Sequence, residues 1–358
     1  MSMNNSLRET NITDRPTCDQ ALETTFMVLN IAFGAVILLG NLSVFLSIAT
    51  RPQLRQQPMN LFIASLAITD IIMAAVVAPS YSLFCVGCLE YAVSKYCWFM
   101  EGSKDIALAS SIYNLLAISY DRALAVYRPL QYPALMTRRR ALIIIVVVWS
   151  LSLFLALIRN FWNHTLTGEE LLAINHKYNV ILLVVVLLIP CIVISVVNIK
   201  IIRTIRKQAH QVYAQAADNT ISADGQTEMV RKWKGTIACA VVVFVFVVSW
   251  VPRISFNIRS VITTDLSSDA LLHKLSIFFF IVQSSVNPFI YSFYRADIRR
   301  ATFKLLSCNK LRSWNIPNWE MRCLVMDMLI GVRSLDYSRA LLLFYFTMET
   351  LQATWFNS

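Results

Sequence analysis

Seven long apolar runs constrain this chain more than any other feature. Each is about 20 to 30 residues long, enough for an α-helix to cross the hydrocarbon core of a bilayer. Inside lipid the backbone has no water to bond to, so each run must pair its own N–H and C=O groups as a helix. The expected fold is therefore all-α, a seven-transmembrane helix bundle. We predict spans at 25–49, 59–84, 97–127, 140–161, 178–204, 232–260 and 270–294.

The composition agrees with a chain that lies mostly in lipid. Hydrophobic residues make up 57% of it and charged residues only 15%, whereas a soluble domain carries about 25% charged residues. The formal net charge of +11 could suggest a nucleic-acid partner. The Lys and Arg residues gather instead in the connections after the first, third and fifth runs, which is the positive-inside pattern of membrane proteins. We expect no nucleic-acid partner, a plasma-membrane location and an extracellular amino terminus.

The chain divides into four predicted parts. These are an extracellular N-terminal segment (1–24), the bundle (25–294), a short amphipathic eighth helix on the membrane surface (295–308) and a cytoplasmic tail (309–358). No signal peptide is evident in the first part, so we expect the first span to direct insertion. Glycosylation sequons begin at Asn4, Asn11 and Asn163, all on the expected outer side.

The eighth helix would turn its apolar side to lipid and its basic residues to anionic headgroups. Cys308 follows it directly and is either a palmitoylation site or a free thiol. The tail is partly apolar, but its apolar stretch is too short to cross a membrane. We have no mechanism for it.

Polar residues inside the apolar runs point to function. Asn287 and Pro288 lie deep in the seventh run, where the backbone groups they leave unpaired must be satisfied by neighbours. Asp121 and Arg122 at the end of the third run are costly unless they are paired or reach the membrane surface. Asp70 is an acid in the middle of a span. Because an ionisable residue there is costly and usually functional, we predict that Asp70 belongs to a functional site.

These residues and several others occur in the order and in the spans typical of rhodopsin-like (class A) G-protein-coupled receptors. From residue 25 to about 308 the chain resembles that family. The resemblance implies a receptor that binds an extracellular ligand in the outer half of the bundle and activates a heterotrimeric G protein, with arrestin and a receptor kinase as further partners. It implies no enzyme activity. The matching residues include Gly40, Asn41, Asn60, Leu61, Leu66, Ala67, Asp70, Asp121, Arg122, Trp149, Pro190, Phe246, Trp250, Pro252, Asn287, Pro288 and Tyr291.

The resemblance also assigns a switch. Arg122 would pair with Asp121 at rest and reach toward the G protein when active, and Leu130 would insert into the G-protein surface. Trp250 beside Pro252 would move with the ligand. The full set is Ile112, Asp121, Arg122, Leu130, Pro190, Phe246, Trp250, Pro252, Asn287, Pro288 and Tyr291. Ordinary core packing is the alternative for Ile112, Pro190 and Phe246.

A sodium ion is the one cofactor that the resemblance implies. The family counterpart of Asp70 binds sodium, and the matching oxygen-bearing partners here are Ser111, Ser284 and Asn287. The alternative is an Asp70 that is protonated or only hydrogen-bonded.

Three departures from the family bear on activation. Ala123 replaces the usual tyrosine after Arg122. Lys232 and Lys234 lie where many relatives carry an acid that holds Arg122, so the resting state should be leaky. Asn198 stands where a tyrosine normally supports the active state in the family.

A fourth departure concerns Cys97, at the outer end of the third run. The family usually joins this cysteine to the second extracellular loop, but the loop from about Asn160 to Lys177 has no cysteine. Cys97 is left to pair with Cys18, Cys85 or Cys88, or to stay free. The short loop resembles those of melanocortin, cannabinoid and lysophospholipid receptors, and the subgroup is predicted near melanocortin, adenosine or cannabinoid receptors.

The predicted ligand cavity lies among the outer halves of spans 3, 5, 6 and 7. Lys104 stands where amine receptors place an aspartate, so a monoamine is not expected. Glu101 and Asp105 favour a basic peptide, whereas Lys104 and Arg253 favour an acidic lipid or a nucleoside-like small molecule. Arg253 could instead pair with Glu101 or Asp105. The predicted lining is Glu101, Lys104, Asp105, Leu108, Arg253, Asn257, His273 and Ile277, with Leu182, Leu183 and Val186 in the fifth span where amine receptors have serines.

The main alternative is a transporter or channel without G-protein coupling. That class predicts internal repeats with broken helices or a charged pore, and the sequence contains no evident repeat. An intramembrane enzyme would need a catalytic set, and the four histidines are spaced unsuitably for a metal.

Overall fold

The computed structural model describes residues 20–80, 97–163, 165, 168–217, 241, 244–262 and 270–306. Helices make up nearly all of this part of the chain, and no strand occurs in it. The chain forms two units, residues 1–300 and 301–358, and the bundle belongs to the first. The elements are α1 (Gln20–Ala49), α2 (Pro52–Arg55), α3 (Pro58–Ile72), η1 (Met73–Val77), α4 (Ala78–Ser80), α5 (Cys97–Tyr127), α6 (Tyr132–Leu135), α7 (Arg138–Asn163), α8 (Gly168–Ile181), η4 (Leu182–Leu188), α9 (Ile189–Ala217), α11 (Val251–Ile262), α12 (Ala270–Tyr294) and α13 (Ala296–Leu306).

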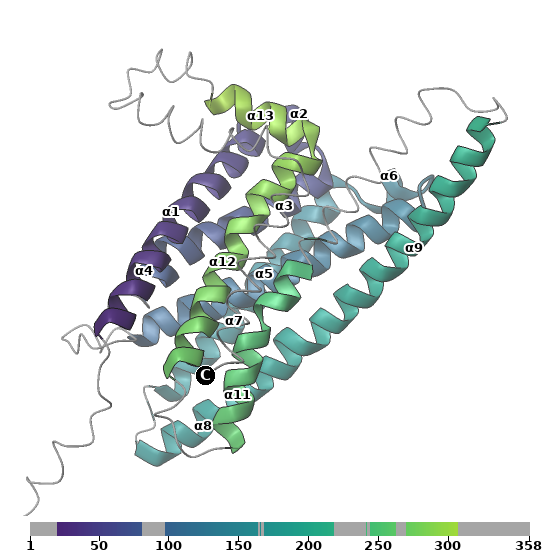
Figure 1. Ribbon diagram of the computed structural model, residues 1–358. Helices are drawn as coiled ribbons and strands as arrows, with labels where there is room; N and C mark the ends of the chain where they lie inside the picture. Colours follow the sequence, from purple (N-terminus) through teal and green to yellow (C-terminus); the bar gives the residue numbers. More distant parts are fainter. Residues whose placement is uncertain are drawn as a thin grey trace, which may run out of the picture. The chain divides into compact units, whose positions relative to one another are not determined.

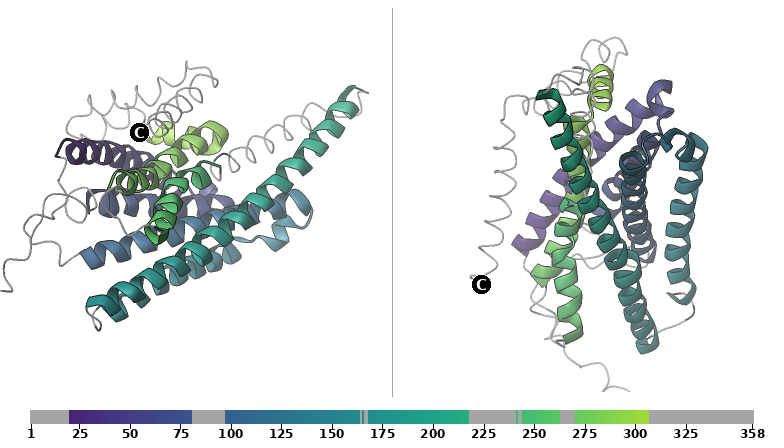
Figure 2. Two further views of the ribbon diagram at one scale, coloured as in Figure 1. Left: turned by 60° about the horizontal axis from the view of Figure 1, so that its bottom comes forward. Right: turned by 90° about the vertical axis from the view of Figure 1, so that its right-hand side faces the viewer.

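The predicted fold class is confirmed. Described helices overlap each of the seven predicted spans, while residues 81–84 of the second and 232–240 and 242–243 of the sixth lie outside the described residues. The second span is α3, η1 and α4 in succession, and the fifth is α8, η4 and α9. Residues 244–249 continue into α11 as the sixth span. Helix α5 packs against α3, α7 and α9, while α1 packs against α3 and α12, and α11 against α12. These helices run side by side in Figures 1 and 2, with α5 among its neighbours.

The fifth span differs most from its prediction. It begins at Gly168 instead of residue 178 and continues to Ala217 instead of 204. Glu169 and Glu170 occupy its first turn, where negative charge is favourable beside the helix dipole. Beyond residue 204 the residues are strong helix formers such as Ala, Gln, Arg and Lys, so a helix continues past the apolar run.

Both π-helical segments precede a proline. Pro79 follows η1, and Pro190 follows η4. A proline has no N–H to donate and its ring clashes with the carbonyl four residues earlier, which a wider turn relieves. The segment η4 therefore lies where Pro190 interrupts the fifth span, and its residues face the cavity described below.

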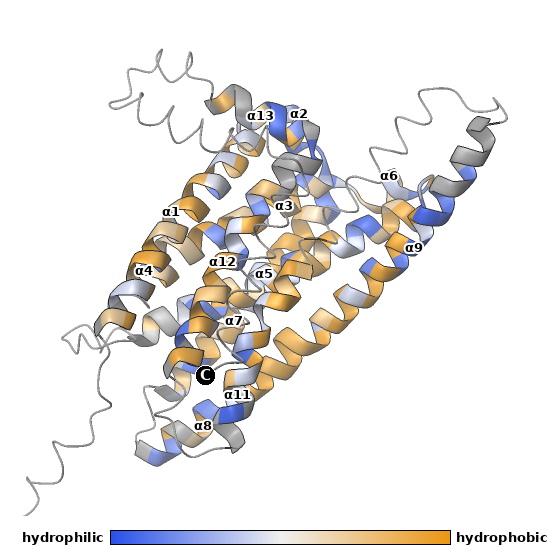
Figure 3. Ribbon diagram, viewed as in Figure 1, coloured by the Kyte–Doolittle hydropathy of each residue, from blue (hydrophilic) through white to orange (hydrophobic). Residues whose placement is uncertain are grey.

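Apolar side chains lie on the outside of the bundle as well as inside it. On α7, Val146 and Phe154 are 63% and 60% exposed, and on α9 Ile192 is 63% exposed. Figure 3 shows the hydrophobic colour over much of α1 and over the lower part of α9, whose upper part carries blue segments. Four described helical segments have the length and apolar composition to cross a membrane: Thr24–Ala49, Pro58–Val77, Arg138–Arg159 and Glu169–Gln208. Such an outer surface is suited to lipid rather than to water.

Candidate functional site

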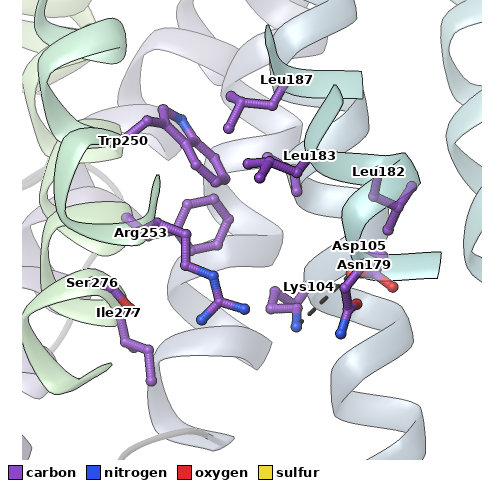
Figure 4. Close-up of a pocket in the computed structure, with 12 residues that line it drawn as sticks. Lys104, Asp105, Asn179, Leu182, Leu183, Leu187, Trp250, Arg253, Ser276 and Ile277 are labelled. Carbon is purple, nitrogen blue, oxygen red and sulfur yellow. Dashed lines mark ion pairs between the residues drawn. The ribbon is translucent and has the colours of Figure 1, made fainter. Parts of the chain in front are cut away.

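A cavity opens among α5, α8 with η4, α11 and α12. Its wall is mostly apolar, with charged groups from α5 and α11 (Figure 4). Trp250, which directly precedes α11, forms part of it. The lining residues are Lys104, Asp105, Leu108, Asn179, Leu182, Leu183, Leu187, Trp250, Arg253, Ser276, Ile277 and Phe280.

Five of the predicted ligand-binding residues line this cavity: Lys104, Asp105, Leu108, Arg253 and Ile277. For the other three, Glu101, Asn257 and His273, the structure describes the helices but not the side chains. The sequence reasoning did not single out Asn179, Leu187, Ser276 or Phe280. Asn179 precedes Leu182 and Leu183 by three and four residues, so helical spacing alone could have found it.

Asp105 lies in a buried ion pair that the sequence reasoning missed. Its Oδ2 is 2.8 Å from Nε of Arg159 on α7, and the two side chains are 3% and 6% exposed. Lys104 Nζ lies 3.9 Å from Asp105 Oδ1. An arginine inside the fourth apolar run was a detectable signal, because charges in a span are rare and usually functional. The pair proposed between Arg253 and Asp105 is not the one the structure forms.

Arg159 is held in place by two neighbours on α8. Its Nη2 donates to Oδ1 of Asn179 at 2.6 Å. Its guanidinium lies 5.0 Å from the centre of the Tyr178 ring, within the range of cation–π attraction. These contacts fix the arginine that neutralises Asp105.

Arg253 reaches into the cavity from α11. Figure 4 shows its guanidinium in the space between α11 and α5, with Lys104 pointing toward the same space. The guanidinium carbon lies 5.5 Å from the centre of the Phe256 ring. Among the described side chains it forms no ion pair with a carboxylate.

Trp250 connects the cavity to the core below it. Its ring packs on Phe280 at 5.2 Å between centroids and on Phe246 at 6.0 Å. Ile112, Pro190 and Phe246 are all buried, as a packed trio requires. The indole N–H of Trp250 is buried without a hydrogen-bond acceptor among the described residues. Pro252 lies two residues further along, within α11.

The residues predicted for sodium lie in the interior. Asp70, Ser111, Ser284 and Asn287 are all less than 10% exposed. Asn287 Nδ2 donates to Asp70 Oδ2 at 2.9 Å. Asp70 Oδ1 is buried without a hydrogen-bond partner in the described part of the chain. A buried carboxylate oxygen without a hydrogen bond, on a group whose other oxygen accepts from an amide, suits a small hard cation.

The far end of α5 carries a second polar cluster. Asp121 is fully buried and pairs with Arg122. Tyr132 on α6 donates its hydroxyl to Asp121 Oδ1 at 2.8 Å. Burial and the nearby Asp121 charge raise the pKa of Tyr132, so the hydroxyl keeps the proton it donates.

Two other residues at this end were also predicted to matter. Leu130, which follows α5, is 96% exposed. Asn198 donates its side-chain amide to Oγ of Ser119 at 2.9 Å and to the carbonyl of Ile194 at 2.8 Å. The asparagine therefore ties α9 to α5 where the family usually has a tyrosine.

Several predicted sites lie outside the described residues. Asn4, Asn11, Lys232, Lys234 and Cys308 belong to segments that the structure does not describe. Cys97, Asn163 and Tyr291 lie in described helices, but their side chains do not belong to the described set. Their modification, pairing and switch roles stay predictions.

Comparisons with known proteins agree with this architecture. The model of the family "7 transmembrane receptor (rhodopsin family)" matches residues 40–291. The histamine H2 receptor of Cavia porcellus is 27% identical over 311 residues, which is 84% of each chain, and that of Homo sapiens is 27% identical over 314 residues with the same coverage. Trace amine-associated receptor 4 of Mus musculus is 26% identical over 299 residues, 79% of this chain and 86% of that receptor.

The family and these relatives are receptors, not enzymes. The names of these relatives refer to amines, whereas the subgroup was predicted near melanocortin, adenosine or cannabinoid receptors. The subgroup therefore stays a prediction without support from these relatives.

Proposed function

The chain belongs to the rhodopsin family of seven-transmembrane receptors, and we propose that an extracellular small molecule acts on it through the cavity above Trp250. It is a G-protein-coupled receptor and a multi-pass protein of the plasma membrane. The observation that carries the proposal is the position of Trp250. This side chain lines the cavity and also packs on Phe246 in the core, so a ligand that moves it would disturb the packing below.

The cytoplasmic response would come from the cluster around Arg122. At rest Asp121 holds Arg122, and Tyr132 supports Asp121. On activation Arg122 would leave this pair and reach the G protein, and the exposed Leu130 would pack against the G-protein surface. Pro252, Asn287, Pro288 and Tyr291 would allow the sixth and seventh spans to move. Arrestin and a receptor kinase are proposed as further partners at this face.

The interior cluster around Asp70 is proposed to hold a sodium ion. Asp70, Ser111, Ser284 and Asn287 would supply its oxygen ligands, and the unpartnered Asp70 Oδ1 supports this assignment. A bound cation would balance the Asp70 charge and favour the packing in which these four side chains stay together.

The topology completes the proposal. Basic residues in the connections after the first, third and fifth spans support an extracellular amino terminus. Segment 1–24 would then be extracellular, with glycans on Asn4 and Asn11 and a further glycan on Asn163. Residues 295–308 would lie on the inner membrane surface with palmitate on Cys308, and residues 309–358 would form the cytoplasmic tail.

The experiment that tests receptor function needs no ligand. We expect cells expressing the wild-type chain to activate at least one Gα class above mock-transfected cells, because Lys232 and Lys234 offer Arg122 no acidic lock. Arg122→Ala should abolish this basal signal, measured by G-protein dissociation across the Gα classes at matched surface expression.

Arg139→Ala is the matched control, because Arg139 is an exposed arginine near the start of α7. It should leave the signal unchanged. An equal basal signal from wild type and Arg122→Ala would contradict the role of Arg122. A wild-type chain that is silent at the cell surface would contradict the leaky resting state.

A further inference from the structure

We propose that the cavity binds a small molecule with an apolar body and one acidic group, and that Arg253 and Lys104 hold the acidic group. This inference rests on the proposed function, because it names the ligand class of the same site. It is opposite in charge to the amines in the names of the related receptors. The inference rests on the charged side chains at the cavity and on how they are paired.

The first step is that Asp105 is committed to the protein. Its Oδ2 lies 2.8 Å from the Arg159 Nε, and both side chains are almost fully buried. Asn179 and Tyr178 fix the other side of that guanidinium. A cationic ligand at Asp105 would have to displace a buried, well-supported arginine and leave its charge uncompensated, which is strongly unfavourable. Asp105 therefore does not serve as the counter-ion of an amine.

The second step is the charge that remains. Among the described side chains that line or support the cavity, the cations are Lys104, Arg159 and Arg253, and the single carboxylate is Asp105. Arg159 and Lys104 both lie against that carboxylate. Arg253 makes a cation–π contact with Phe256 instead. The described surface of the cavity therefore carries an excess of positive charge.

The third step is the surroundings of Arg253. Arg253 is half-buried, and the cavity it enters has the apolar walls Leu183, Ile277 and Phe280. Charges in such a site need a partner of opposite sign. A carboxylate, sulfonate or phosphate monoester that enters the cavity supplies one, and a guanidinium can bind it through two parallel N–H donors.

The same walls define the rest of the ligand. Leucines from η4, Ile277 and the rings of Trp250 and Phe280 form an apolar surface beside the two cations. An aromatic or short aliphatic body would pack there while its acidic group reaches Arg253 and Lys104 (Figure 4). Small aromatic acids and medium-chain fatty acids share this chemistry.

The test uses acid and amine probes with the same body. The first pair is indole-3-acetate and tryptamine, which have an aromatic body. The second pair is octanoate and octylamine, which have an aliphatic body. Comparing the pairs shows which kind of body the cavity prefers. Thermal unfolding of the purified full-length receptor is measured in lipid nanodiscs over a range of probe concentrations at neutral pH. A ligand that binds only the folded state raises Tm with its concentration. At least one acid should raise Tm, and its paired amine should not.

Variants then locate the binding. Arg253→Gln and Lys104→Gln should each weaken the response to the acid about 10-fold to 100-fold, the range of a lost charged hydrogen bond. Arg259→Gln, an exposed arginine on the same helix, is the control and should keep the wild-type response. Lys104→Asp should weaken the response to the acid and allow the paired amine to raise Tm. Because this variant gains binding of the amine, it tests the proposal even if Arg253→Gln does not fold.

Three results would overturn the proposal. These are an amine that stabilises the wild type more than its acid, a panel in which no acid shifts Tm, and an acid response that Arg253→Gln and Lys104→Gln leave unchanged. None of them affects the basal G-protein signal that depends on Arg122. A failure of the ligand class is therefore distinguishable from a failure of the receptor function.

Discussion

At the scale of single residues, Gly40 shows how closely the helices approach. A Cβ at this position would lie 2.9 Å from Cγ and 3.1 Å from Cβ of Pro288. The obstacle is a proline ring within α12, which cannot rotate away as a flexible side chain can. The contact therefore requires the absence of a side chain, and it brings α1 against the proline of the seventh span.

The prediction at this scale compares three glycines. Gly40→Ala should destabilise the receptor by about 1–3 kcal/mol, the range for overpacking a tight site, and should lower Tm and surface expression. Gly102→Ala meets nothing within 4 Å, and Gly34→Ala meets only ordinary contacts at 3.7 Å. Because alanine is the better helix former, both controls should be neutral or stabilising. A Gly40→Ala receptor as stable as the Gly102→Ala receptor would show that the two helices separate easily.

At the scale of elements, Arg295 connects the start of the eighth helix to the second span. Its Nη2 donates to Asn60 Oδ1 at 2.8 Å and to Asp297 Oδ2 at 2.7 Å, and its Nε donates to Asp297 Oδ1 at 3.0 Å. Asp297 holds the guanidinium in position for Asn60. Arg295 is the single residue between α12 and α13. Its side-chain bonds to α3 therefore act directly on the connection between the two helices.

This network predicts a pH dependence. Burial alone would raise the pKa of Asp297, but the hydrogen bonds and charge of Arg295, together with backbone hydrogen bonds at Asp297 and Ile298, hold the pKa below its ordinary value of 3.8. A carboxyl with a folded-state pKa below its unfolded one contributes stability above the unfolded value and loses it as pH falls through the folded value. The contribution should therefore be constant from neutral pH to about pH 4 and decline below that.

The measurement is Tm against pH for wild type and Asp297→Asn. The wild type should be the more stable at neutral pH, and the difference between the two should narrow only in the acid range. Glu170→Gln, an exposed acid in the first turn of α8, controls for removal of one negative charge. A difference that is already lost between pH 7 and pH 5 would mean that another group titrates.

At the scale of the whole molecule, the bundle has apolar side chains on its outer surface and polar ones within. Val146, Val147 and Phe154 of α7 are all more than half exposed. Asp70, Asn114 and Ser110 are almost completely buried. A soluble protein has the opposite arrangement, so the solvent that this outer surface fits is lipid.

Val147 tests that statement. It lies near the middle of the crossing segment Arg138–Arg159 and is 57% exposed. Val147→Asp should reduce membrane insertion and surface expression strongly, because an aspartate at the centre of a transmembrane helix costs about 2.5–3.5 kcal/mol. Val147→Leu should be neutral. If Val147→Asp reached the surface as well as wild type, this face of α7 would have to contact water or a polar partner.

The sequence by itself determined the class of fold and located the candidate switch residues. Lipid leaves an apolar run one conformation, so the spans could be located from local composition. The largest difference is in the fifth span, whose helix begins at Gly168 and ends at Ala217. The positions of Asp121, Arg122, Trp250 and Asn287 followed from motifs within single spans. These are properties of neighbouring residues along the chain.

Only the tertiary structure decided how the charges of the cavity are paired. From the sequence, Asp105 could be matched with Arg253 or with a basic peptide ligand, and Arg159 was not considered. Helix α7 brings Arg159 within 2.8 Å of Asp105, while Arg253 faces the cavity from α11. The choice of partner depends on the rotation and spacing of three helices that are distant in sequence. Coulomb energy depends on those distances and on burial, and neither can be read from a single span.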